Sequence, residues 1–293
     1  MSSDHFATRF IDWALASPTV HALIQIGSRC RPAGTPGGPD EFSDWDFQIV
    51  TSDAAALTAP GGLSAIGVGE PLVFTARPGR LGSVTKITAL FADGLLDIVL
   101  IPLDRVQALF AFGTQDRRTE NRPARDLAEI ALIYRGGYRF LKDTLKAEPT
   151  VSKLIAASPA PRLDDTAVVN LAQAFLCDAY AVRAQLRRGE LRASQRFLHA
   201  QLAETNFALL HELMLRTGRT AFPDARRIEI LAPEEWVRAV TIDATPTAPS
   251  LAAAIDRANA ACLQLAQALL RGSPLLPPLE QAFAQAATIV PPK

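Results

Sequence analysis

Hydrophobic and polar positions follow two different periods along this chain of 293 residues. Residues 4–16 open it with a helical period that gathers three aromatic side chains on one face. Short apolar runs follow, bounded by Gly, Pro and Asp, and such runs are typical of strands. The predicted strands are 20–26, 45–51, 64–69, 71–75, 84–91 and 95–101. An Asp-Gly turn at 92–94 indicates that the last two form a hairpin.

The pattern changes at about residue 104, where strand signals stop and helical periods take over. The predicted helices cover 165–188 and 191–216, a short segment that begins at 233, and 250–270. Short connections between long amphipathic helices indicate an antiparallel bundle. The predicted fold class is therefore α+β: an N-terminal α/β domain with a mixed sheet (1–155), followed by a C-terminal helical domain (156–293).

Composition narrows the possible partners and location. Hydrophobic residues make up 48% of the chain, charged residues 20%, and the net charge is zero, as in soluble globular proteins. The basic residues are scattered, whereas a duplex-binding protein carries a basic stripe, so nucleic acid is not an expected partner. Three widely separated cysteines indicate neither a disulfide framework nor a zinc site. Without a signal-peptide pattern or an apolar run near the roughly 20 residues of a membrane span, we expect a cytoplasmic protein that makes no membrane contact.

Three carboxylates are the candidate metal ligands. Asp44 and Asp46 stand two residues apart at the start of a predicted strand, so their side chains share one face while their apolar neighbours share the other. Two carboxylates about 7 Å apart along a strand repel each other unless a cation lies between them. Asp97 is the lone carboxylate on the face of another apolar strand. Brought together, the three would form a site for Mg²⁺, which takes one or two carboxylates together with phosphate oxygens and water.

A Gly-Ser turn after the first strand supplies a candidate phosphate site. Gly27 allows close backbone approach, and the N–H and hydroxyl of Ser28 can donate to a phosphate at a helix start. Arg29 is a candidate either for pairing with a phosphate or, equally, for a surface contact that caps the sheet. The candidate nucleotide-binding residues are therefore Gly27, Ser28 and Arg29.

These residues carry a resemblance to a known superfamily. The matching motifs are G-S-R at 27–29, S-D-W-D-F at 43–47 and D-I-V-L-I-P at 97–102. They resemble the nucleotidyltransferases related to DNA polymerase beta. The segment L-F-A-D-G-L-L-D-I-V-L-I-P-L-D (90–104) further resembles the aminoglycoside 6-adenylyltransferases, also called streptomycin adenylyltransferases. The likeness is tight over 20–104 and limited to helix pattern over 165–217. The loop at 31–41 is longer than its counterpart in that family.

The resemblance implies an activity and roles for the three acids. Members of the family transfer AMP from ATP to a hydroxyl of a small acceptor, an aminoglycoside such as streptomycin, release pyrophosphate and confer antibiotic resistance. By this likeness residues 1–155 form the catalytic domain and residues 156–293 bind the substrate. The likeness also implies that Asp44 and Asp46 hold Mg²⁺ and that all three acids are catalytic. Asp97 acts as the general base in preference to a further metal ligand. Gly27 and Ser28 would hold the β- and γ-phosphates.

The acceptor of such an enzyme is a polycation, which requires carboxylates and aromatic faces around it. In the helical half Asp178 is the leading candidate, because it stands beside apolar residues in a helix poor in acids. The weaker candidates are Tyr180, Glu190, Glu204 and Glu212. Two alternatives stay open from the residues alone. One is a nucleotidyltransferase with another small-molecule or protein acceptor, and the other is a nucleotide-binding relative that has lost turnover.

Overall fold

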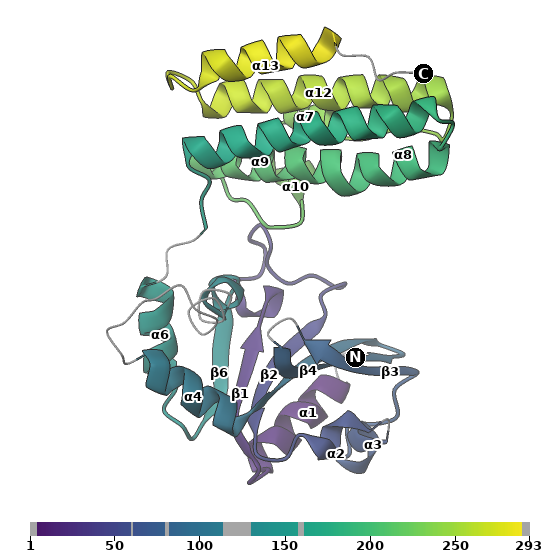
Figure 1. The fold of residues 1–293 in the computed structure, drawn as a ribbon. Coiled ribbons are helices and arrows are strands. Elements are labelled where there is room, and N and C mark those ends of the chain that lie inside the picture. Colours follow the sequence, from purple (N-terminus) through teal and green to yellow (C-terminus); the bar gives the residue numbers. More distant parts are fainter. Residues whose placement is uncertain (1–4, 60, 80–81, 114–129, 158–160, 289–293) are drawn as a thin grey trace. The chain divides into compact units, whose positions relative to one another are not determined.

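The chain forms two compact units, residues 1–160 and 161–293, and each is described by itself. The computed structural model describes residues 5–59, 61–79, 82–113, 130–157 and 161–288 (Figure 1). The first unit is α/β and the second is helical, so the predicted α+β class is confirmed. The boundary predicted after residue 155 lies in the last turn of a helix, α6 (Glu148–Ala157), and the division found comes a few residues later. The substrate-binding role of the second unit stays a prediction.

A mixed sheet organises the first unit. Its strands are β1 (Val20–Ile26), β2 (Trp45–Thr51), β3 (Val73–Gly79), β4 (Gly82–Phe91), β5 (Gly94–Pro102) and β6 (Tyr138–Asp143). They lie in the order β3-β4-β5-β2-β1-β6. The central pair, β2 and β5, runs parallel, and the other neighbours in this order run antiparallel. The hairpin predicted between β4 and β5 is present, because Phe91 pairs with Gly94.

One face of the sheet carries the main core of this unit. The helix α1 (His5–Ala16) covers it, and its buried aromatic residues meet those of the strands: the ring centroids of Phe10 and Phe47 are 5.3 Å apart. The apolar alternation of β2 and β5 supplies the rest of this layer, with Ile49 and Ile98 fully buried. Because the apolar side of β2 faces this core, the alternate positions, which include Asp46, face the other side of the sheet.

The opposite face of the sheet is covered only in part. Val106 of α4 (Leu103–Gly113) packs on it together with Val50, and Tyr134 of the helical segment 130–135 packs there together with Val151 of α6. Two predictions are wrong in this unit. Residues 64–69 lie in the short helix α3 (Gly62–Ala65), which follows α2 (Ala55–Thr58), and in a turn. Strand structure also continues past residue 104, in β6.

The second unit is a bundle of antiparallel helices. Its elements are α7 (Asp165–Arg187), α8 (Leu191–Phe197), η2 (Leu198–Ala203), α9 (Glu204–Arg216), α10 (Ile228–Leu231), α11 (Glu234–Val240), α12 (Ala248–Leu269) and α13 (Leu276–Thr288). The predicted helix over 191–216 is continuous, with a π-helical stretch at η2. The helix α12 packs against α7, α9 and α13, and buried leucines, alanines and Phe175 fill the space between them. No described helix is long and apolar enough to cross a membrane.

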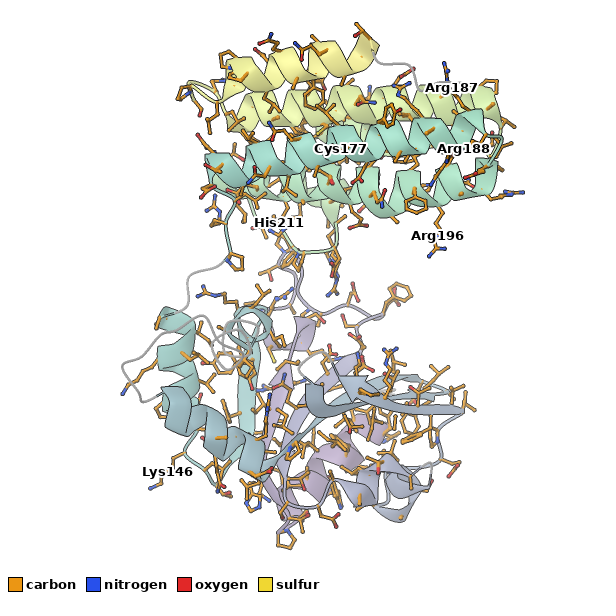
Figure 2. All side chains as sticks on the ribbon, viewed as in Figure 1. Lys146, Cys177, Arg187, Arg188, Arg196 and His211 are labelled. Carbon is orange, nitrogen blue, oxygen red and sulfur yellow. The ribbon has the colours of Figure 1, made fainter. Side chains whose placement is uncertain are left out.

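Basic residues are more concentrated in this unit than the sequence interpretation assumes. Arg187 and Arg188 at the end of α7 and Arg196 on α8 lie at the same end of the bundle (Figure 2). All three are exposed. Cations at the last turn of a helix complement its dipole, which gives Arg187 and Arg188 a structural reason for their place.

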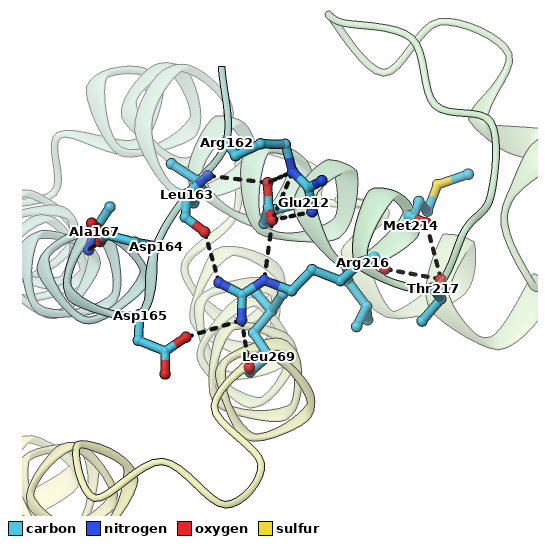
Figure 3. Close-up of polar contacts among 11 residues, drawn as sticks. Arg162, Leu163, Asp164, Asp165, Ala167, Glu212, Met214, Arg216, Thr217 and Leu269 are labelled. Carbon is cyan, nitrogen blue, oxygen red and sulfur yellow. Dashed lines mark hydrogen bonds and ion pairs between the residues drawn. The ribbon is translucent and has the colours of Figure 1, made fainter. Parts of the chain in front are cut away.

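An ion network around the buried Glu212 joins the start of the bundle to α9 (Figure 3). Glu212 is 3% exposed, and Arg162 donates to it through Nε and Nη2. It also accepts from the N–H of Leu163 and from Nε of Arg216. The same Arg216 donates to Asp165, so the start of α7 is tied in as well. Both carboxylate oxygens of Glu212 are therefore already bound within the bundle, and a role for Glu212 in binding the acceptor is not supported.

Candidate metal and nucleotide site

The parallel pairing of β2 and β5 brings the three candidate carboxylates together. Asp46 lies directly opposite Asp97 in the register, and Asp44 precedes β2 by one residue. One carboxylate oxygen from each lies within 4.8 Å of the others. Because β2 and β5 are neighbours although about 50 residues separate them in sequence, two short motifs converge on one face of the sheet. We call Asp44, Asp46 and Asp97 the acid triad.

The electrostatics of the acid triad leave negative charge in excess. Burial, and then the charges of Asp44 and Asp97, raise the pKa of Asp46 to about 7, while Lys86 acts in the opposite direction. Oxygen ligands at this spacing suit a hard divalent cation such as Mg²⁺ or Mn²⁺, since such ions bind carboxylate oxygens. The donor set therefore fits the Mg²⁺ that the sequence predicts.

Gly27 lies against the acid triad, and its missing side chain is what allows this. Its φ is +84°, and a Cβ built on it would stand 2.8 Å from Oδ2 of Asp46. The Gly27 N–H donates to the carbonyl of Gly137 at 3.0 Å, which fixes the turn at the end of β1. Both the conformation and the close approach require glycine here. The backbone of the predicted phosphate turn thus borders the carboxylates.

Ser28 begins a single 3₁₀ turn, η1 (Ser28–Cys30), and the longer helix expected there is absent. Its carbonyl accepts from the N–H of Arg31. A turn this short lacks the aligned peptide dipoles of a helix N-terminus, so any phosphate binding by Ser28 would depend on its own N–H and hydroxyl. That role stays a prediction.

Arg29 is held by the backbone next to the acid triad. Its Nε donates to the carbonyl of Asp44 at 3.0 Å and its Nη2 to the carbonyl of Ser43 at 2.7 Å. Its guanidinium also lies over the ring of Trp45, 4.1 Å from the centroid. Of its two predicted roles, these contacts correspond to the structural one, and they orient the segment that carries Asp44. Pairing with a phosphate stays a prediction.

Sequence reasoning missed two residues that contact the acid triad from β4. Lys86 Nζ lies 2.6 Å from Oδ2 of Asp97. The hydroxyl of Thr88 donates to Oδ1 of Asp97 at 2.6 Å, because Thr88 is directly opposite Asp97 in the register. The period of β4 held a usable signal: Lys86 and Thr88 are polar positions that alternate with the buried Ile87 and Ala89.

The acceptor candidates lie in the helical unit. Asp178 is half-buried on α7. Its neighbours Cys177 and Tyr180 line a groove of about 860 Å³ along α7, α12 and α13. Glu204 and His211 line a smaller cavity of about 210 Å³ beside α9; burial lowers the pKa of His211 (Figure 2). The role predicted for Asp178 stays a prediction.

This chain is similar to known proteins only in its structure. No family model and no curated protein matches the chain. An aminoglycoside 6-adenyltransferase from Bacillus subtilis is similar over 99% of this chain and 100% of its own length, with 12% identity and a TM-score of 0.40. A nucleotidyltransferase-like protein from Exiguobacterium sibiricum is similar over 92% of this chain and 77% of its own, with 10% identity and a TM-score of 0.33. Because these similarities are low, the function of this chain has to be inferred from its own residues.

Proposed function

We propose that this protein is a Mg²⁺-dependent nucleotidyltransferase that transfers AMP from ATP to a hydroxyl of a small acceptor and releases pyrophosphate. The observation that carries the proposal is the acid triad itself. One carboxylate oxygen from each of the three acids lies within 4.8 Å of the others, beside the turn at Gly27, where a Cβ would stand 2.8 Å from Oδ2 of Asp46. A purely structural role does not account for them, since three clustered carboxylates that share one ammonium, that of Lys86, repel one another.

Each residue of the site has a task in this reaction. Asp44 and Asp46 bind Mg²⁺, which screens the charge of the triphosphate and supports in-line attack at the α-phosphorus. Asp97 accepts the proton of the acceptor hydroxyl. A bond forms between that hydroxyl oxygen and the α-phosphorus, the bond to the bridging oxygen breaks, and its electrons leave with pyrophosphate. Gly27 and Ser28 bind the β- and γ-phosphates through N–H groups and a hydroxyl.

For the acceptor we propose an aminoglycoside such as streptomycin, bound with help from the helical unit. The support is the resemblance of residues 90–104 to the aminoglycoside adenylyltransferases. A polycationic acceptor requires acidic and aromatic side chains. Asp178 on α7 and Glu204 beside the cavity of α9 are the described acids that we assign to this task.

The test is pyrophosphate release from ATP and Mg²⁺ with a panel of aminoglycosides led by streptomycin. We expect release that needs one acceptor, and we expect Asp97→Asn to lower it by about 10²–10⁴-fold, the range of a general base. Asp44→Asn should lower both turnover and Mg²⁺-dependent ATP binding. Asp93→Asn is the matched control, because Asp93 is exposed in the β4–β5 turn and lies outside the acid triad.

The outcomes separate the two parts of the proposal. If no aminoglycoside in the panel causes pyrophosphate release while ATP and Mg²⁺ still bind, the proposed aminoglycoside acceptor is wrong. Transfer to other small hydroxyl compounds or to proteins is then followed with ATP labelled at the α-phosphate. Absence of Mg²⁺-dependent ATP binding, or equal activity of Asp44→Asn and the unsubstituted protein, contradicts nucleotidyl transfer itself.

A further inference from the structure

Lys86 and Thr88 between them occupy both oxygens of Asp97. The ammonium lies 2.6 Å from Oδ2, and the hydroxyl donates to Oδ1 at 2.6 Å. The side chain of Asp97 is only 12% exposed, whereas that of Lys86 is 32% exposed. The carboxylate is thus fixed in the sheet, while the ammonium has a route to solvent.

We propose that Lys86 is an exchangeable counter-ion of the acid triad: it holds Asp97 while no metal is bound, and moves to a phosphate oxygen once metal and nucleotide bind. Lys86 is a positioning residue in this scheme, since it acts through Asp97. The inference rests on the proposed function, because it takes a divalent ion and a triphosphate as the ligands of the site.

Competition for one oxygen is the first reason. Whether Asp97 acts as a base or as a metal ligand, it needs an oxygen that no ammonium holds, and Oδ2 is held by Lys86. A lysine ammonium is a hydrated point charge on a flexible stem, so it can leave without disturbing the strand. Thr88 stays on Oδ1 and keeps the carboxylate oriented after Lys86 has moved.

The balance of charge is the second reason. When all three carboxylates are ionised, they exceed one ammonium by two charges, which is the charge of one divalent ion. When that ion binds, the ammonium is no longer needed at the carboxylates. The nucleotide brings several negative charges to the same place, and a lysine near a triphosphate is attracted to its oxygens. Lys86 therefore opposes binding of the metal alone and favours binding of the nucleotide.

Lys86→Met tests the first half in the full-length protein without nucleotide. Calorimetric titration with Mn²⁺ should show binding tighter by about fivefold to tenfold, in the range usual for coupled sites. Lys86→Arg keeps the charge and should bind Mn²⁺ as the unsubstituted protein does. Thr88→Val removes a neutral partner of Asp97 and alters no charge, so it should not tighten Mn²⁺ binding as Lys86→Met does.

Lys146→Met is the matched control for loss of one positive charge from the same unit. Lys146 is exposed, follows β6, and projects into solvent (Figure 2). Asp143 at that end of β6 pairs with Ala22, whereas Asp46 pairs with Ile26 at the other end of β1. A general effect of net charge would tighten Mn²⁺ binding equally in both lysine variants, and would overturn the proposal.

The second half is tested by ATP binding at saturating Mn²⁺. Lys86→Met should weaken it by about tenfold and raise KM for ATP more than it lowers kcat, because uniform binding of substrate is lost. The proposal requires that Lys86→Met bind Mn²⁺ more tightly and ATP more weakly than the unsubstituted protein does. Any other pair of results overturns it. If the unsubstituted protein and Asp44→Asn both fail to bind Mn²⁺, the proposed metal site falls together with this inference. If only Asp44→Asn fails while Lys86→Met equals the unsubstituted protein, the role of Lys86 alone is wrong.

Discussion

The two units of this chain bury carboxylates in opposite ways. In the helical unit Glu212 meets two arginines and a backbone N–H, and although burial acts against them, these partners lower its pKa. In the α/β unit Asp46 lies among two further carboxylates, and burial together with their charge raises its pKa to about 7. Both side chains are largely removed from water. Glu212 has hydrogen-bond donors and positive charges around it, whereas Asp46 has more negative than positive charge around it.

This is the difference that we expect between an acid with a structural role and one with the role proposed for Asp46. A fold that needs a buried carboxylate for its own stability surrounds it with donors, as around Glu212. A cluster kept at a net negative charge is destabilising until a cation arrives, and it persists where binding that cation is useful. Glu212 was one of the weaker acceptor candidates, whereas Asp46 belongs to the acid triad, and their surroundings distinguish them where the sequence alone could not.

Glu212→Gln should have the largest effect on stability. Gln keeps the shape but removes the charge that Arg162 and Arg216 share, so we expect the free energy of unfolding to fall by about 2–3 kcal/mol. This is less than for a fully buried pair, because Arg162 is partly exposed. Urea unfolding followed by circular dichroism measures it. Glu234→Gln is the control, since Glu234 pairs with Arg238 on an exposed helix face and should change stability little. Equal effects of the two substitutions would contradict the structural role of Glu212.

Gly27→Ala should have the next largest effect, and Gly67→Ala isolates its cause. Both glycines have a positive φ, +84° and +81°, so alanine is strained by about 1–2 kcal/mol at either position. Around Gly67 the space is open, whereas at Gly27 the added Cβ meets Oδ2 of Asp46 at 2.8 Å. We expect Gly27→Ala to be the more destabilising by about 1 kcal/mol and to lose Mn²⁺ binding, which Gly67→Ala keeps. Intact Mn²⁺ binding in Gly27→Ala would show that the turn does not shape the site.

Much of the fold of the α/β unit could be predicted because its strands are strongly apolar. The predicted strands 20–26 and 45–51 match β1 and β2, since short, mostly apolar runs bounded by turn residues are typical of buried strands. The strand β6 was missed because it lies at the edge and mixes charged with aromatic residues over six positions. The predicted strand at 64–69 was wrong, because its short apolar run could equally be a helix or a turn.

The candidate site was predictable only in its acids. Asp44 and Asp46 are recognisable by their spacing within one strand, and Asp97 by being a lone charge in an apolar run. The short turn between β4 and β5 fixes their register, which places Thr88 opposite Asp97. Lys86 was missed because it pairs with Val99, and its contact with Asp97 depends on the course of its long side chain. The contact of Arg29 with the carbonyls of Ser43 and Asp44 depends on how the intervening loop returns, a tertiary feature that no local pattern shows.

The last prediction concerns the pH dependence of Asp46, for which the sign of the change in stability is the decisive result. Its folded-state pKa, about 7, lies above the ordinary value of 3.8, so the folded state binds the proton more tightly than the unfolded state does. Stability from this group is therefore present at low pH and is lost as pH rises from about 4 to about 7. For Glu212, whose pKa is lowered, the sign is reversed: the stability that it contributes is present above the ordinary value of 4.5 and is lost as pH falls through the folded-state pKa.

Urea unfolding of Asp46→Asn and of the unsubstituted protein, without metal, measures this effect. The two curves of stability against pH should separate between about pH 4 and about pH 7, with the variant the more stable at pH 7. Mg²⁺ should then close that gap by stabilising the unsubstituted protein alone, whereas a gap that ignores both pH and Mg²⁺ would remove Asp46 from the candidate site.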